Sequence, residues 1–171
     1  MATLQDFSLI KTYIEKFKKD YQLESAAKSF PYFCLDSILG LQPDEIEEAL
    51  TEGGMDRGID AIYIDESSSA AVVHIFNFKH TDKYDKLKNN FPSNEVDKIL
   101  TIIKQILDSD KNLKKQVNSK LFEKVNNIWN IFENQNPHFV IYLCSNFENN
   151  LVQAECERFE REISRYNNFQ V

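Results

Sequence analysis

The sequence predicts an α/β fold, a three-layer sandwich in which helices cover a mixed central sheet. Two β-type runs, residues 59–64 and 71–78, flank a Ser-rich turn. Segments with apolar residues at helical spacing precede and follow this hairpin, and a third apolar run at 138–144 stands between later helices. Strands that are joined through helices lie in a sheet with parallel pairs, so the hairpin and the later strand together indicate a mixed sheet.

Helices are expected ahead of the hairpin. Apolar residues at helical spacing predict an amphipathic helix over residues 4–17. A more apolar helix over residues 23–39 is interrupted by Pro31 and ends at Gly40, a usual residue after a helix C-terminus. Pro43 followed by acidic residues predicts a further short helix, because the macrodipole favours acids in the first turn.

The segments after the hairpin alternate between helix and strand. Residues 80–90 are polar and aperiodic, which predicts a mobile surface loop. Helices are then predicted over residues 91–108, 112–132 and 149–166, and the last three residues look like the start of a strand. We therefore expect residues 1–171 to form one domain, a helix in 1–22 and a core in 23–171, belonging to a longer protein with additional C-terminal domains.

Composition limits the class of protein. A length of 171 residues with 42 % hydrophobic and 27 % charged residues is usual for a folded domain of this kind. The net charge of −7 argues against a general polyanion binder, so nucleic acid would need a local basic patch. No apolar run approaches the roughly 18 residues of a membrane span, and the N-terminus lacks a signal-peptide pattern. We expect a cytoplasmic protein with no membrane partner.

Polar residues interrupt the apolar hairpin only at the ends far from its turn. They are Asp60 on the first run and Asn77 and Lys79 on the second. A turn near Ser68 and Ser69 places Asp60 directly opposite Asn77, with Cβ atoms roughly 4.5–5.5 Å apart. Alternation along the strand puts Asn77 and Lys79 on one face. An acid, an amide and an ammonium then converge at one end of the sheet, as a site or as a structural salt bridge.

The hairpin and its approach carry a resemblance to a known superfamily. Three of the four glycines lie just before the first strand, in the pattern GGxDxGIDAIYID, and the second strand ends in Asn-x-Lys. Residues 53–80 thereby resemble the PD-(D/E)XK nucleases, most closely Mrr-like restriction endonuclease domains and the N-terminal domain of abortive-infection phage-resistance (AIPR) proteins. The resemblance implies a restriction-endonuclease-like fold and a Mg²⁺-dependent endonuclease, for which Mn²⁺ can substitute, that hydrolyses DNA in phage defence.

The same resemblance assigns roles to individual residues. Lys79 would be the catalytic lysine, acting with Asp60 and Asn77. The implied metal ligands are Asp60, Asn77, the Phe78 backbone carbonyl and Glu24, with Asp36 as the other candidate for the acid from the preceding helix. Asn77 departs from the acids common at its position, since it keeps the oxygen but lacks the charge. An acid there would be expected to bind metal more strongly.

The expected partner is DNA, with RNA as a second nucleic-acid partner and a homo-oligomer as a further state. Residues expected to contact phosphates are Arg57, Lys83, Lys86 and Lys88. Two alternatives stay open. The absent charge at Asn77 and the net charge of −7 favour a catalytically inactive nuclease-fold module that binds nucleic acid or protein. In an interaction domain of another class, Asp60 and Lys79 would form only an ion pair.

Overall fold

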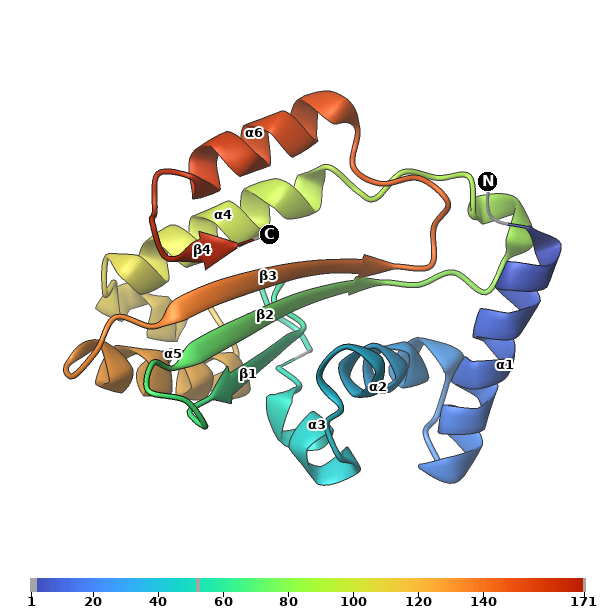
Figure 1. Ribbon diagram of the computed structural model, residues 1–171, viewed down its shortest axis with the longest axis horizontal. Helices are drawn as coiled ribbons and strands as arrows, with labels where there is room; N and C mark the ends of the chain where they lie inside the picture. Colours follow the sequence, from blue (N-terminus) through green and yellow to red (C-terminus); the bar gives the residue numbers. More distant parts are fainter. Residues whose placement is uncertain (1–2, 52, 171) are drawn as a thin grey trace. The chain divides into compact units, whose positions relative to one another are not determined.

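The computed structural model describes residues 3–51 and 53–170, and within them the protein is a mixed α/β fold with six α-helices and a four-stranded sheet (Figure 1). The chain forms two compact units, each assembled from separate stretches. The first unit comprises Met1–Glu48, Phe78–Phe91 and Cys144–Leu151, and the second comprises Ala49–Asn77, Pro92–Leu143 and Val152–Val171.

The first unit begins with two helices that pack against each other, α1 (Leu4–Asp20) and α2 (Ala26–Leu39). Thr3 and Asp6 form a reciprocal capping box that fixes the start of α1. Helix α2 runs through Pro31, where the sequence suggested an interruption, and Pro31 lies on the buried face of that helix. Packing of this apolar face offsets the one backbone hydrogen bond that proline removes.

The remaining parts of the first unit are a short helix, α3 (Pro43–Ala49), whose last residue belongs to the second unit, and the segment after β2. The structure places a single 3₁₀ turn, η1 (Tyr84–Lys86), in the segment predicted as a loop. The Thr81 amide donates to Asn146 Oδ1 at 2.9 Å, and Asn146 Nδ2 donates to the Thr81 carbonyl at 2.7 Å. Because Leu87 is also buried, this segment is anchored at both ends.

The sheet has the order β1 (Ala61–Asp65), β2 (Val72–Lys79), β3 (His138–Ser145), β4 (Phe169–Gln170). Strands β1 and β2 are antiparallel, and Ala61 lies opposite Phe76, which confirms the predicted hairpin register. The arrows of β2 and β3 run in the same direction in Figure 1, and β4 is parallel to β3. The predicted mixed sheet is therefore confirmed, while Val171, the last residue of the predicted terminal strand, lies outside the described residues.

The second unit contains three helices, α4 (Asn94–Leu107), α5 (Ser119–Phe132) and α6 (Gln153–Ile163), and each of them buries an apolar face. Trp129 Nε1 donates to the Ile106 carbonyl at 2.8 Å and links α5 to α4. The helix predicted over 112–132 is divided into a 3₁₀ turn, η2 (Lys111–Lys115), and α5. The division falls at Asn118, whose side chain caps α5 by accepting from the Leu121 amide.

These elements are compatible with an α/β sandwich, and the restriction-endonuclease-like topology stays a prediction. In residues 3–51 and 53–170, no helix combines the length and apolar character needed to cross a membrane.

Candidate functional site

A tight turn positions the first strand of the candidate site. Met55, Arg57 and Gly58 all have left-handed backbone conformations, with φ of 67°, 56° and 78°. The Asp56 carboxylate accepts from the Gly58 amide at 2.9 Å, and its carbonyl accepts from the Ile59 amide at 3.0 Å. A Cβ atom on Gly58 would lie 3.1 Å from Glu95 Oε2. Glycine is thus required both by the backbone and by the close approach of α4.

Asp60 is held between two neighbouring backbone segments just before β1. Its amide donates to the Phe76 carbonyl at 2.9 Å, and its carbonyl accepts from the Thr51 amide at 2.9 Å. The regular pairing of β1 with β2 ends at Ala61 and Phe76, so the predicted opposition of Asp60 and Asn77 falls one residue beyond the ladder. The Asp60 side chain is half-buried, whereas Asn77 is 1 % exposed.

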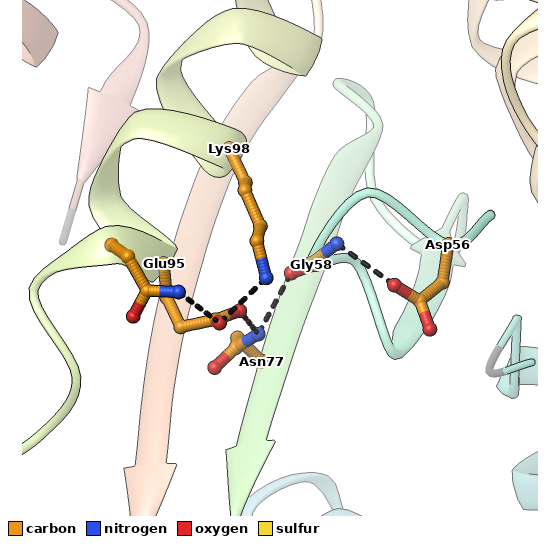
Figure 2. Close-up of polar contacts among 6 residues, drawn as sticks. Asp56, Gly58, Asn77, Glu95 and Lys98 are labelled. Atoms are coloured by element: carbon orange, nitrogen blue, oxygen red, sulfur yellow. Dashed lines mark hydrogen bonds and ion pairs between the residues drawn. The ribbon is translucent and has the colours of Figure 1, made fainter. Parts of the chain in front are cut away.

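Asn77 uses its amide nitrogen to connect β2 to two other elements (Figure 2). Nδ2 donates to the Gly58 carbonyl at 2.9 Å and to Glu95 Oε2 at 3.2 Å. Both partners are acceptors, so the nitrogen must face them. Oδ1 is buried without a hydrogen-bond partner in the described part of the chain. Asn77 therefore presents donors to Glu95, and an acid at this position would face another carboxylate.

Glu95 is the buried carboxylate of this cluster, in the first turn of α4 and 5 % exposed. Its Oε1 lies 2.8 Å from Lys98 Nζ. The hydrogen bond to Glu95 raises the pKa of Lys98, and the charges of Glu95, Asp56 and Asp60 raise it further, against a smaller opposing effect of burial. The Lys98 ammonium thus contacts Glu95 on α4 and is also influenced by the charges of Asp56 in the turn and Asp60 just before β1.

Glu95 was not among the site residues predicted from the sequence, although the sequence contains a signal for it. Glu95 shares the apolar face of α4 with Ile99, Ile102 and Ile106, at helical spacing. A charged residue on a buried helix face needs a partner. The pattern therefore predicts that Glu95 is a buried acid with a partner, but it does not identify Asn77 and Lys98 as the partners.

The structure distributes the predicted site residues over both units. Asp60 and Asn77 lie in the second unit, while Phe78, Lys79 and Glu24 belong to the first. Lys79 is the last residue of β2, two positions after Asn77, so strand alternation puts both on one face. Glu24 is exposed and lines a cavity of about 280 Å³ in the first unit. Asp36, the other candidate, is exposed on α2.

The predicted phosphate contacts are all exposed. Lys83, Lys86 and Lys88 lie in or beside η1 of the first unit. Arg57 lies in the second unit, where its Nε donates to the Gln116 carbonyl at 3.0 Å. Positive side chains are therefore available to solvent in each unit.

The residues around Lys98 suit a divalent cation in the kind of donor they offer. Asp60 and Glu95 supply hard carboxylate oxygens, and Mg²⁺ is commonly held by one or two carboxylates with water completing its shell. The number of protein ligands is small, however. Among residues 3–51 and 53–170, no three His, Cys, Asp or Glu side chains are grouped so as to hold a metal ion. An ion would use two carboxylates and water, and it would meet the ammonium of Lys98.

Comparisons with known proteins identify no relative. No protein-family model matches the chain, no curated protein matches it, and no solved structure is significantly similar to it.

Proposed function

We propose that this chain is a divalent-metal-dependent nuclease of restriction-endonuclease-like fold that hydrolyses phosphodiester bonds in DNA. One observation carries the proposal. The buried carboxylate of Glu95 lies against the Asn77 amide, with Nδ2 3.2 Å from Oε2. Glu95 therefore offers, from α4, the negative charge that Asn77 lacks. Asp60 and Glu95 then give the two acids that such chemistry requires.

The roles of Asp60, Glu95 and Asn77 follow from their positions in the second unit, and the role of Lys79, which belongs to the first unit, follows from the resemblance of residues 53–80. Asp60 and Glu95 would hold Mg²⁺ or Mn²⁺, which when bound neutralises phosphate charge and lowers the pKa of a water molecule. Asn77 and the Gly58 turn hold the Glu95 carboxylate in place through the two bonds from Nδ2. Lys79 would stabilise the developing negative charge during hydrolysis.

Several parts of this proposal rest on the resemblance of residues 53–80. They are the role in phage defence and the preference for DNA over RNA. Cytoplasmic location and homo-oligomerisation likewise stay predictions from the sequence. Arg57, Lys83, Lys86 and Lys88 are proposed to contact phosphates, because their charges are exposed.

A plasmid-cleavage assay with Mg²⁺ or Mn²⁺ tests the proposal. Asp60→Asn, Glu95→Gln and Lys79→Met should each lower the cleavage rate by about a hundredfold or more, because each removes a charge used in the transition state. The control is Glu123→Gln, which replaces an exposed acid on α5, and this variant should cleave at the wild-type rate. In the structure Glu24 precedes α2, which begins at Ala26. Comparison of Glu24→Gln with Glu95→Gln decides which of these two residues supplies the acid, and we expect Glu95. Cleavage that survives both Asp60→Asn and Glu95→Gln would show that these acids do not form the site.

A second candidate function is a catalytically inactive nuclease-fold module that binds nucleic acid or protein. The ion pair between Glu95 and Lys98 favours it, since this pair already neutralises the buried acid. Such a module would bind DNA in a gel-shift assay with equal affinity with and without divalent metal, and would leave plasmid intact under all conditions. Metal-dependent cleavage by the wild type excludes it.

A further inference from the structure

Lys98 places a positive charge on the one buried carboxylate of the candidate site. Its Nζ lies 2.8 Å from Glu95 Oε1, and the Glu95 side chain is 6 % exposed. A buried carboxylate without a counter-ion is strongly unfavourable, so Glu95 requires a cation at this position. Lys98 supplies a cation there.

The two partners of this ion pair differ in how firmly they are held. Glu95 is fixed from the opposite side, because its Oε2 accepts from Asn77 Nδ2, which also binds the Gly58 carbonyl. The Lys98 side chain is 47 % exposed, and it reaches from α4 down to Glu95 in Figure 2. A long, flexible side chain that is half in solvent can leave without disturbing the backbone. Lys98 is thus the movable partner.

The Lys98 ammonium contacts Glu95 directly, and the charges of Asp56 and Asp60 also act on it. A doubly charged cation attracts a carboxylate more strongly than a singly charged ammonium does at the same distance. We propose that Lys98 is an internal counter-ion that a divalent cation displaces from Glu95, so that Lys98 sets the metal concentration at which the site is filled. The location of the ion rests on the proposed function, while the exchange itself is a property of the ion pair.

Mn²⁺ titration by isothermal calorimetry on the full chain tests this exchange. Lys98→Met removes the competing charge, so its Kd for Mn²⁺ should be at least about tenfold lower than that of the wild type. Lys98→Arg places a stronger, two-pronged partner on the carboxylate and should weaken Mn²⁺ binding. Lys104→Met, at an exposed lysine of the same helix, should bind as the wild type does.

Melting temperature gives an independent readout. Without metal, Lys98→Met should melt below the wild type because Glu95 has lost its counter-ion, and saturating Mn²⁺ should raise its Tm more than that of the wild type. Adding Glu95→Gln to Lys98→Met should abolish the gain in affinity. A Kd for Lys98→Met equal to or above the wild-type value would overturn the proposal, and so would a gain that persists with Gln at position 95. If Lys98→Met does not fold, Lys98→Arg decides, since unchanged binding by that variant contradicts displacement.

Failure of this inference and failure of the nuclease proposal give different results. Tighter Mn²⁺ binding by Lys98→Met with uncut plasmid would support the ion exchange and reject the nuclease. Metal-dependent cleavage by the wild type, with equal Mn²⁺ affinity in both proteins, would support the nuclease and reject the exchange.

Discussion

At the scale of single residues, the orientation of the Asn77 amide changes how the site is understood. The sequence predicted that Asp60 and Asn77 are opposite each other, and the strand pairing follows the predicted register as far as Ala61 and Phe76, one residue short of that pair. The sequence could not predict that Nδ2 would face Gly58 and Glu95. That contact joins a turn, a strand and a helix, and it depends on how α4 packs on the turn.

Replacing Asn77 with Asp reverses what the sequence suggests. An acid at this position was expected to strengthen metal binding. In the structure it would lose two donated hydrogen bonds and place a second buried carboxylate beside Glu95. We expect the free energy of unfolding to fall by about 3 kcal/mol, from unsatisfied acceptors and like-charge repulsion. Urea denaturation without metal measures the change.

The matched control for this variant is Asn127→Asp, at an exposed position on α5. It makes the same chemical change in solvent and should leave the unfolding free energy within about 0.5 kcal/mol of the wild type. If Asn77→Asp is destabilised by no more than this control, the amide does not hold the site together.

At the scale of helices and strands, the sequence predicted which elements exist more accurately than the residues at which they begin and end. Hydrophobic periodicity identified the hairpin and the three later helices, because each buries one continuous face. The helix predicted from residue 112 begins instead at Ser119. Asn118 determines this start, and part of its stabilisation comes from Thr51 and Gly54, which are distant in sequence.

Asn118→Ala should therefore affect two elements together. The substitution removes the cap on the Leu121 amide and the 2.9 Å bond from Nδ2 to the Thr51 carbonyl. We expect a loss of about 2 kcal/mol in unfolding free energy, the upper part of the range for a helix cap. Asn118→Asp keeps the capping oxygen and should lose less. Ser119→Ala, at the exposed next residue, should be nearly neutral in the same urea titration.

At the scale of the whole molecule, the division into two units could not be read from the sequence. Each unit combines stretches that are far apart in the chain, so no composition change or linker marks a boundary. The sequence predicted the mixed sheet because strand pairing and helical crossovers follow local patterns. Which segments pack into which unit depends on contacts such as that of Thr81 with Asn146, and these have no local signal.

Stability should fall as the pH decreases from 7.5 to 5.5, through one histidine in each unit. Burial lowers the pKa of His74 and of His80, against the opposing charges of Asp65 and Asp82. Below the unfolded-state pKa of about 6.5, the unfolded chain therefore binds more protons than the folded one, which favours unfolding. The urea midpoint should be lower at pH 5.5.

The double variant His74→Gln, His80→Gln should show a smaller decrease in midpoint over this pH range. His138→Gln, at an exposed residue that begins β3, should keep the wild-type decrease. An equal decrease in all three proteins would mean that other groups control the pH dependence.

Strands β2 and β3 each belong to both units, because the unit boundary falls between Asn77 and Phe78 in β2 and between Leu143 and Cys144 in β3. Truncating the chain at a single position therefore cannot yield either unit intact. A fragment that begins at Ala49 would still carry 78–91 and 144–151, now without the helices of the unit to which they belong. To isolate the second unit, the ends of β2 and β3 would have to be redesigned. Recombination during evolution could not exchange one unit alone either, because both units share these two strands.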